Sequence, residues 1–408
     1  MDTLFQFVDA HLFASLVDLK DKGEHEVLDF KTYAEIYRQV RECVDLCHRD
    51  GVIKDEVARN PQKYIVWDQG LIPMLQRYRE SGVKVFILTN SLWEYTSTAM
   101  NYLYHGKKVD DETLQRNEWL SLFDIWCVVA FTRLDKLFVP CRPSYRDTFL
   151  FSIVGSCKPA YMLDPYLNLF RVNPQDGSLK NTDGCFEIEA LGENGAQKFL
   201  DQGKTFQGGN WLHLHSMLEI NSGDEILYVG DHLYADVLRS KRTLGWRSCF
   251  IMPELEEEMR QFSATKHLRH SITELRRLME EVAIYKEDIL RRASTTTTTN
   301  TTGAAKNSAK ILEELDEDLL IIKDRVKELT DQWHRAFHPV WGAMFNAGYT
   351  DSRFAFYVDN YACLYTSRAT NLGLSSTSRS FRTSLAILPH DLLLTNSEYV
   401  QRSNPWAD

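Results

Sequence analysis

The 408 residues carry a net charge of −10, with 44% hydrophobic and 25% charged residues, the composition of an ordinary globular protein. This length allows two to three domains with a sizeable core. No basic run is long enough to suggest a nucleic-acid partner, and no apolar run is long enough to predict a membrane span. The first residues lack the pattern of a secretory signal, so we predict a cytoplasmic protein.

The eight cysteines include no CxxC pair. Cys43 and Cys47 have helical spacing and His48 follows directly, so this segment could suggest a zinc site. No second pair of ligands follows at a suitable spacing, and we therefore predict free thiols that are buried or half-buried. Free thiols are typical of a reducing compartment, in agreement with a cytoplasmic location.

Residues 1–79 are predicted to be mainly helical, with a second helix over residues 31–48. Arg41 and Asp45 lie four residues apart in that helix, so they share one face. Spacing alone favours a solvated ion pair between them. Lys54 follows after a glycine turn.

Residues 83–90 form an apolar run that predicts a strand. Thr89, Asn90 and Ser91 lie at its carboxyl end, directly before a predicted helix. Backbone amides and hydroxyls at such a strand-to-helix turn can hold a phosphate. The alternative is that Asn90 or Ser91 simply caps the helix.

Residues 123–131 are the next candidate strand, and Lys136 lies just beyond it. A lysine at this place could neutralise a nucleophilic carboxylate or a phosphate, although most lysines at strand ends are merely exposed. Residues 173–177, Asn-Pro-Gln-Asp-Gly, predict a hairpin turn. Residues 206–210 contain two glycines and predict a turn that leads into a helix.

A short apolar run at residues 226–229 predicts a buried strand that ends at Gly230. Asp231 follows the strand directly, and Asp236 comes five residues later, before a predicted helix. The two carboxylates could both face a divalent cation, and Mg²⁺ prefers such hard oxygen ligands. The alternative is that an aspartate caps the following helix. On this segment alone the two interpretations are about equally supported.

Strands alternate with helices from residue 83 to residue 252. This alternation is typical of an α/β protein with a doubly wound parallel sheet. Open sheets of this kind bind their ligands at the carboxyl ends of the strands. We therefore expect one set of side chains to gather there: Thr89, Asn90, Lys136, Asp231 and Asp236.

The rest of the chain is predicted to be mainly helical. Residues 254–292 and 311–337 have apolar side chains at helical spacing, and the two segments could form a coiled-coil hairpin. Its tip would be residues 293–309, a low-complexity segment with five consecutive threonines that we predict to be a disordered linker. Residues 354–359 could be a strand or a buried helix.

Several of these segments together resemble known motifs. Ile87-Leu-Thr-Asn-Ser91, a lysine after the next strand and Gly230-Asp-His-Leu-Tyr-Ala-Asp236 resemble motifs of the haloacid dehalogenase superfamily. The chain is more similar still to the cytosolic purine 5′-nucleotidase family, of the IMP-GMP-specific type, and to its 5′-nucleotidase domain-containing relatives. Further matching segments are Tyr228-Val-Gly-Asp-His232, Asp236-Val-Leu-Arg-Ser-Lys241, Gly245-Trp246-Arg247, Pro253-Glu254-Leu255, His338-Pro-Val-Trp-Gly342, Ala347-Gly-Tyr349, Tyr365-Thr-Ser-Arg368 and Leu388-Pro-His390.

The resemblance implies a division of the chain into domains. Residues 1–79 would be a helical cap region that contacts substrate, and residues 80–292 a Rossmann-like core of the haloacid dehalogenase type. An insertion is expected around residues 139–168. After the linker at 293–309, residues 310–408 would be a helical C-terminal region that packs on the core. The resemblance also implies an oligomer of identical chains.

The resemblance implies an activity as well. Members of this family are Mg²⁺-dependent phosphohydrolases that remove the phosphate of purine nucleoside monophosphates, such as IMP and GMP, through an aspartyl-phosphate. Asp231 matches the metal ligand and Asp236 supports it, while Lys136, Thr89 and Asn90 match catalytic positions. The matching substrate contacts are Arg41, Asp45, Lys54, Thr89, Asn90 and Ser91, which opposes the ion-pair interpretation of Arg41 and Asp45.

One feature of the family is missing from the sequence. The reaction starts from a DxD motif after the first strand, whose first aspartate attacks phosphorus and whose second acts as acid and base. Asp18 and Asp21 lack this spacing, and Tyr361 stands where a second acid after Asp359 should be. Asp316-Glu-Asp318 has the spacing but lies in a predicted helix. We therefore expect a chain that looks truncated at its amino terminus and lacks the nucleophile and its central strand.

Two other functions follow from that departure. The chain could be a catalytically inactive truncated isoform or pseudoenzyme with a binding or regulatory role. A third interpretation is a helical scaffold built on residues 254–350. The sequence feature that separates the nucleotidase interpretation from the inactive one is the strand that carries the DxD motif, which the nucleotidase requires.

Overall fold

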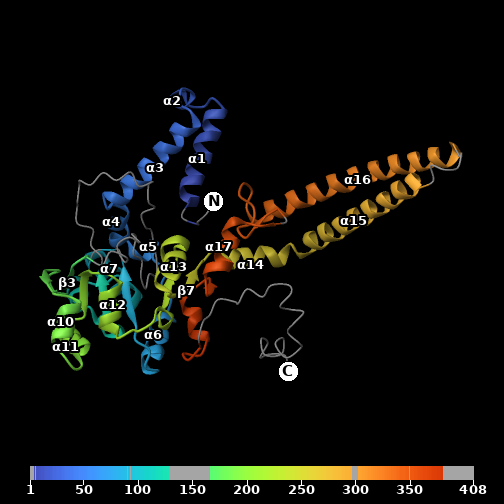
Figure 1. The fold of residues 1–408 in the computed structure, drawn as a ribbon. Helices are drawn as coiled ribbons and strands as arrows, with labels where there is room; N and C mark the ends of the chain where they lie inside the picture. The colour runs from blue at the N-terminus through green and yellow to red at the C-terminus, as the bar shows by residue number, and fades with distance from the viewer. Residues whose placement is uncertain are drawn as a thin grey trace, which may run out of the picture. The chain divides into compact units, whose positions relative to one another are not determined.

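The computed structural model describes residue 4 and residues 6–89, 91, 93–128, 166–295, 302–348 and 350–379, with β2 described only in its backbone after residue 125. The chain divides into two compact units. The larger unit comprises residues 8–251, 360–365 and 369–408, and the smaller comprises residues 1–7, 252–359 and 366–368. Figure 1 shows the helices and strands of both units.

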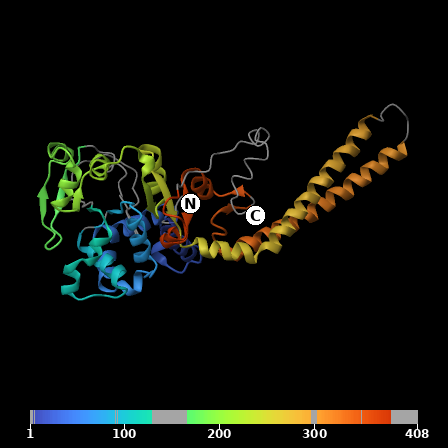
Figure 2. The ribbon, with the colours of Figure 1, turned by 90° about the horizontal axis from the view of Figure 1, so that it is seen from below.

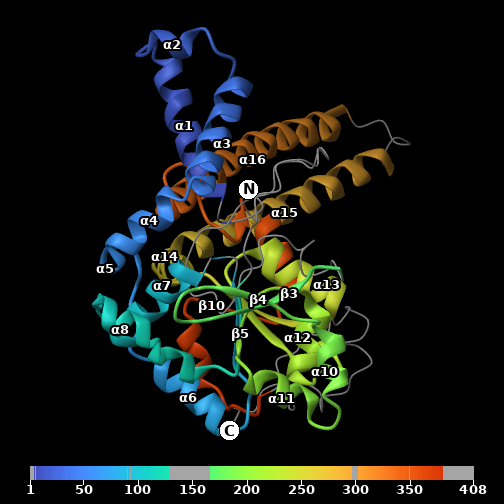
Figure 3. The same cartoon turned by 90° about the vertical axis from the view of Figure 1, so that its left-hand side faces the viewer.

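The larger unit begins with a helical layer. Helices α1 (Gln6–Asp21) and α3 (Tyr33–Arg49) lie side by side (Figures 1 and 3), joined through α2 (Glu26–Asp29). Phe13 and Tyr37 make an edge-to-face ring contact between them, with centroids 5.5 Å apart. Thr32 and Glu35 form a capping box that starts α3, close to the start that the sequence predicts.

Further helices follow in the larger unit. Helix α6 (Leu71–Glu80) is amphipathic, and its buried face consists of Leu71, Met74 and Leu75. The remaining described helical elements between α3 and residue 125 are α4 (Val52–Arg59), α5 (Pro61–Tyr64), α7 (Trp93–His105), α8 (Asp111–Arg116) and the 3₁₀ turn η1 (Glu118–Leu122).

The first sheet has the order β1-β2-β5-β3-β4. Its members are β1 (Phe86–Thr89), β2 (Ile125–Val128), β3 (Leu169–Val172), β4 (Leu179–Asn181) and β5 (Thr205–Gly208). β1, β2 and β5 are parallel, whereas β3 runs antiparallel to both β4 and β5. The predicted hairpin turn at residues 173–177 is confirmed, since the amide of Gly177 donates to the carbonyl of Asn173 at 2.8 Å between β3 and β4.

The second sheet has the order β10-β7-β6. β6 (Leu227–Gly230) and β7 (Arg247–Ile251) are parallel, in the register that pairs Leu227 with Arg247. β10 (Leu364–Thr366) lies on the other side of β7. Between β6 and β7 the chain forms the π-helix η3 (Leu233–Arg239) and helix α13 (Ser240–Leu244). The helix after Asp231 therefore starts four residues earlier than Val237, where the sequence predicts it.

The two sheets share both of their hydrophobic cores. Ile87 of β1 and Val229 of β6 belong to one cluster, which α4, α6 and α7 cover. Leu88 and Tyr228, the neighbouring residues, belong to a second cluster, which α10, α11 and α12 cover. Because successive strand residues point to opposite faces, we infer that the sheets lie edge to edge with helices on both faces. The covering helices of the second face are α10 (Cys185–Ala190), α11 (Gly195–Asp201) and α12 (Trp211–Leu218).

This arrangement confirms the coarse part of the fold prediction, an α/β protein with a parallel sheet. The described strands other than β8 and β9 form two sheets, and β3 runs antiparallel to both β4 and β5. β1 and β6 are the end strands of their sheets. The doubly wound topology of the haloacid dehalogenase type stays a prediction, as does the division into domains.

A buried asparagine organises the loop before β2. Asn117 is 4% exposed and adopts a left-handed conformation with φ of 45°. Its Oδ1 accepts hydrogen bonds from Ser97 Oγ at 2.6 Å, Trp119 Nε1 at 3.1 Å and Asn101 Nδ2 at 3.2 Å. The carbonyl oxygen therefore satisfies three buried donors at the point where α8 ends.

We expect Asn117→Ala to destabilise the larger unit by about 2–4 kcal/mol, because it leaves buried donors without an acceptor and places alanine in a left-handed conformation. Chemical denaturation measures the change. Asn194→Ala is the matched control, since Asn194 is exposed and also left-handed with φ of 58°, and it should cost only the roughly 1–2 kcal/mol of backbone strain. Equal effects of the two substitutions would contradict the prediction.

The smaller unit contains a long helical hairpin. α15 (Lys266–Thr295) and α16 (Thr302–Phe337) lie side by side (Figure 2). Their base packs around Ile272, Leu329 and Trp333, and Lys286 forms an ion pair with Asp316 farther along. These contacts confirm the predicted hairpin.

Two details of the smaller unit differ from the predictions. α16 begins at Thr302, inside the predicted linker at 293–309, because Ala304, Ala305 and Lys306 favour a helix. The apolar segment at 354–359 lies in helix α17 (Arg353–Tyr361) and is not a strand. The remaining elements are α14 (Leu255–Ala264), the strand pair β8 (Asn346–Ala347) and β9 (Thr350–Asp351), and, outside this unit, the 3₁₀ turns η2 (Gly223–Glu225) and η4 (Ala369–Leu374).

Candidate functional site

The turn after β1 is built around the hydroxyl of Thr89. Thr89 is the last residue of the strand and is 8% exposed. The amide of Ser91 donates to Thr89 Oγ1 at 3.2 Å, and Thr96 Oγ1 of α7 donates to the carbonyl of Ser91 at 3.4 Å. The chain thus bends over the strand end at a strand-to-helix turn, which is a geometry that can hold a phosphate. The phosphate contacts of Thr89 and Ser91 stay a prediction.

Gly230 permits a close approach of Asp236 to the end of β6. A Cβ atom on Gly230 would lie 2.5 Å from both Cβ and Oδ2 of Asp236. No real Cβ atom makes such contacts, so only glycine fits at this position unless the loop shifts. The Gly-Asp-x-x-x-x-Asp spacing in the sequence therefore has a steric cause, because the second aspartate folds back onto the strand end.

Asp236 is held by its own loop. It is 1% exposed, its Oδ1 accepts a hydrogen bond from Tyr228 Oη at 3.3 Å, and its Oδ2 accepts one from the amide of His232 at 3.0 Å. A buried carboxylate needs such donors to offset its desolvation. Asp236 consequently fixes the backbone on both sides of Asp231, which itself is half-buried.

The helix after Asp231 is capped by His232, not by the aspartate. Nδ1 of His232 accepts a hydrogen bond from the amide of Ala235 at 3.0 Å, and His232 is the N-cap of η3. Burial lowers the pKa of His232 to about 4, so the imidazole is neutral near pH 7, as an accepting Nδ1 requires. The interpretation in which Asp231 caps this helix is therefore wrong. A π-helix such as η3 is often found at functional sites.

The donors at this loop fit a magnesium ion. Asp231 offers hard carboxylate oxygens at the carboxyl end of a parallel strand, and Mg²⁺ commonly takes only one or two protein carboxylates besides waters and substrate phosphate. Among the described residues no cluster of three or more His, Cys, Asp or Glu side chains could hold a metal. Asp231 is thus the candidate ligand, and Asp236 is suited to support it, since hydrogen bonds engage both of its oxygens.

Lys54 lies against the helix that follows the Thr89 turn. Its Nζ is 5.7 Å from the ring centroid of Tyr95 on α7, within the range of a cation–π interaction. Tyr95 is largely buried, and burial raises its pKa to about 12, so the ring stays neutral. The fold therefore places Lys54 close to the segment that carries Ser91, although the two lie far apart in the sequence.

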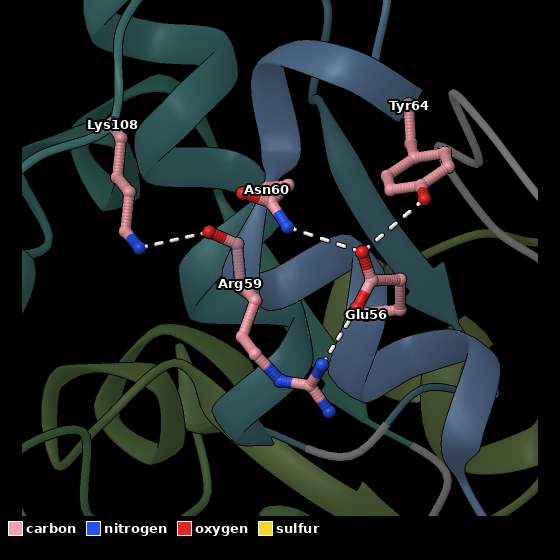
Figure 4. A network of polar contacts seen from close by, with 5 residues as sticks. All are labelled: Glu56, Arg59, Asn60, Tyr64 and Lys108. Atoms are coloured by element: carbon pink, nitrogen blue, oxygen red, sulfur yellow. Dashed lines mark hydrogen bonds and ion pairs between the residues drawn. The ribbon is translucent and has the colours of Figure 1, made fainter.

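A polar network fixes the helix that carries Lys54 (Figure 4). Glu56 Oε1 accepts hydrogen bonds from Asn60 Nδ2 at 3.1 Å and from Tyr64 Oη at 3.3 Å, and Arg59 Nη1 lies 2.6 Å from Glu56 Oε2. Lys108 Nζ donates to the carbonyl of Arg59 at 2.9 Å. The bond from Asn60, above all, lowers the pKa of Glu56, so the carboxylate stays ionised and ties α4 to α5.

Arg41 and Asp45 form the ion pair that their spacing predicts, but the arginine is buried. Arg41 Nη2 lies 2.6 Å from Asp45 Oδ1, and Arg41 as a whole is 9% exposed. Its Nη1 contacts a second carboxylate, that of Asp9 on α1. The resemblance argued against this ion pair, and on that point the prediction is wrong. The substrate contacts of Arg41 and Asp45 stay a prediction.

The structure brings together Arg41 with Asp45, Thr89 with Ser91, and Asp236 with the backbone beside Asp231, while Lys54 contacts Tyr95 on the helix after the Thr89 turn. Asn90 and Lys136 lie outside the described residues, and so does nearly all of the segment 139–168. Sequence reasoning missed Asp9, Tyr95 and Tyr228. Only Asp9 had a visible signal, since it is an acid in a leucine-rich helix.

The acids considered for the nucleophile lie on helices. Asp18 and Asp21 belong to α1, Asp316 and Asp318 to α16, and Asp359 to α17. The cysteines that the structure describes with their side chains, at positions 43, 47, 185, 249 and 363, are free thiols. Cys43 and Cys47 are exposed, however, and only Cys249 is buried.

Comparison with known proteins shows the family of the chain. A sequence profile described as the 5′ nucleotidase family matches residues 1–133 and 128–393. The chain belongs to the 5′ nucleotidase family. It is 24% identical over 257 residues to the human 5′-nucleotidase domain-containing protein 2. This family membership confirms the resemblance seen in the sequence.

The coverage of that relative is partial. The similar region makes up 62% of this chain and 39% of the human protein, so the chain spans about two fifths of its relative's length. Membership of the 5′ nucleotidase family indicates a hydrolase by family. None of the helices in the described ranges combines the length and the apolar character needed to cross a membrane.

Proposed function

We propose that this protein serves as a Mg²⁺-dependent 5′-nucleotidase that removes the phosphate of purine nucleoside monophosphates. The observation that carries the proposal is the loop after β6, where Gly230 and Asp236 hold Asp231 at the end of a parallel strand. Family membership supports the reaction class, and the Thr89 turn at the end of β1 supports a phosphate substrate.

In the proposal each group has a separate role. Thr89, Asn90 and Ser91 hold the phosphoryl oxygens, while Asp231 is the ligand of Mg²⁺ and Lys136 compensates negative charge. Mg²⁺, when bound, would neutralise charge on the phosphoryl group. Preorganised donors of this kind stabilise the transition state of phosphoryl transfer by positioning and electrostatics.

The attacking carboxylate would be carried by a segment other than the helices considered for it, because Asp316 and Asp318, the pair with the DxD spacing, lie on α16. β1 and β6 are end strands that share two hydrophobic cores. A strand between them would complete one continuous sheet and end between Thr89 and Asp231. In-line attack by its aspartate would form an aspartyl-phosphate and release the nucleoside, and water would then hydrolyse the phosphoenzyme.

The test compares the protein purified from its own cells with the recombinant 408-residue chain. Phosphate release is measured with IMP, GMP, AMP and CMP, in Mg²⁺ and in EDTA, and the intact mass of the endogenous protein is compared with 47.4 kDa. We expect the endogenous protein to hydrolyse the purine nucleotides only in Mg²⁺. The recombinant chain should bind the same nucleotides without turnover.

Other outcomes would decide against the proposal in different ways. An endogenous protein of 47.4 kDa without turnover would favour the inactive, regulatory interpretation. Hydrolysis that persists in EDTA would refute the role of Mg²⁺. Faster hydrolysis of CMP than of IMP or GMP would refute the purine preference.

A further inference from the structure

The charged residue Asp9 is the most buried position of helix α1. It is 2% exposed, and no other residue of α1 (Gln6–Asp21) is buried. Apolar neighbours on the same helix are exposed, with Val8 at 58% and Leu12 at 43%. Burying a carboxylate is costly unless a partner compensates its charge. An apolar residue would serve helix packing better, so packing does not explain Asp9.

Arg41 supplies the compensating charge from the neighbouring helix. Its Nη1 contacts Asp9 Oδ2, and its Nη2 contacts Asp45 Oδ1 at 2.6 Å. The side chains of Asp9, Arg41 and Asp45 are 2%, 11% and 38% exposed, respectively. The three groups therefore run from the interior to the surface, with the guanidinium held between two carboxylates.

Two carboxylates on the two terminal nitrogens define the plane of a guanidinium. Arginine has a rigid, planar fork of donors, so engaging both Nη1 and Nη2 leaves little freedom of rotation. Asp45 lies on the same helix as Arg41, one turn away, and is partly hydrated. Asp9 alone comes from another element, and it fixes the guanidinium from the buried side.

We propose that Asp9 is a positioning residue that holds Arg41 in the orientation needed to contact a nucleoside monophosphate. This inference rests on the proposed function and on the contact of Arg41 with the substrate that the family resemblance implies. Asp9 itself does not touch the nucleotide. Its negative charge aligns the fork before the ligand arrives, so binding does not have to order the Arg41 side chain.

The first test measures the geometry without any ligand. Nitrogen-15 NMR of the arginine side chains in the full chain reports how freely the Arg41 guanidinium rotates. We expect slow rotation and a protected Nε–H in the wild type and in Asp9→Glu, and fast rotation in Asp9→Asn. Asp18→Asn is the matched control, because Asp18 is an exposed acid on the same helix that pairs with Lys22. Unchanged rotation in Asp9→Asn would overturn the proposal.

The second test is a double-mutant cycle on IMP binding, measured by calorimetry with Asp9→Asn, Arg41→Ala and the double variant. We expect Asp9→Asn to weaken binding about tenfold and to add no further loss in the Arg41→Ala background, because Asp9 acts through Arg41. A merely structural role would lower the melting temperature and leave the dissociation constant unchanged, which would overturn the proposal. If the wild type binds IMP and Asp9→Asn binds equally well, only this inference fails. If the wild type binds no purine nucleotide, the proposed function fails with it.

Discussion

Gly230→Ala is expected to destabilise the larger unit by about 1–3 kcal/mol, in the range of overpacked sites, and to weaken Mg²⁺ binding. The new methyl group would lie 2.5 Å from Asp236 Oδ2. Asp236 cannot turn away without cost, because it is buried and bonded to Tyr228 and to the amide of His232. The clash must therefore move the loop that carries Asp231. Thermal denaturation and calorimetric titration with Mg²⁺ measure the two effects.

Gly245→Ala is the control for a glycine that has no close neighbour. Gly245 has φ of +70°, and a Cβ atom there would meet nothing within 4 Å. The substitution should cost about 1 kcal/mol of backbone strain and leave Mg²⁺ affinity unchanged. A Gly230→Ala protein with the melting temperature and Mg²⁺ affinity of the wild type would show that Asp236 does not hold this loop.

Asp231→Asn is expected to have the largest effect on chemistry. The substitution keeps the size of the side chain and removes the negative charge that would bind the metal. If the endogenous protein has the proposed activity, its kcat should therefore fall by about 10²–10³, the size seen when one electrostatic stabiliser is removed. In the 408-residue chain, the Mg²⁺ dissociation constant should rise at least about tenfold, since hard cations need carboxylate ligands.

Two comparisons make this result specific to Asp231. The melting temperature without metal should change little, because Asp231 is half-buried at the loop. Asp224→Asn serves as a surface control, since Asp224 is exposed and pairs with Arg247, and it should leave both kcat and Mg²⁺ affinity at the wild-type values. Asp231→Asn with full turnover would remove Asp231 from the metal site.

Local signals in the sequence located much of the secondary structure correctly. The strands at β1 and β6 follow from apolar runs that end in Thr89 and in Gly230, and the turn between β3 and β4 follows from its Pro and Gly residues. The hairpin of α15 and α16 follows from apolar spacing. The prediction of a turn over residues 206–210 is wrong for residues 206–208, which belong to β5 (Thr205–Gly208). This strand is short and ends in glycine, so its residues do not show the apolar pattern that identifies a strand.

Part of the candidate site could be predicted from the sequence, and part required the tertiary structure. Asp231 and Thr89 could be named from the sequence because each directly follows or ends an apolar strand, where α/β proteins bind ligands. The burial of the Arg41 ion pair could not be predicted, since Asp9 lies 32 residues away on another helix. The approach of Lys54 to Tyr95 likewise needed the packing of α4 on α7.

By itself the sequence determined the family and the elements that end in Thr89 and Asp231, because apolar periodicity, turn residues and motif spacing act over a few neighbouring residues. The tertiary structure alone decided that Asp236 folds onto Gly230, that His232 caps the next helix, and that Asp9 holds Arg41. It also decided that β1 and β6 end two sheets with shared cores. The contact of Asp9 with Arg41 and the shared cores join distant segments, so their free energy comes from burial and pairing that no local pattern records. The contacts of Asp236 and His232 lie within one loop, but they depend on a backbone conformation that residue spacing does not specify.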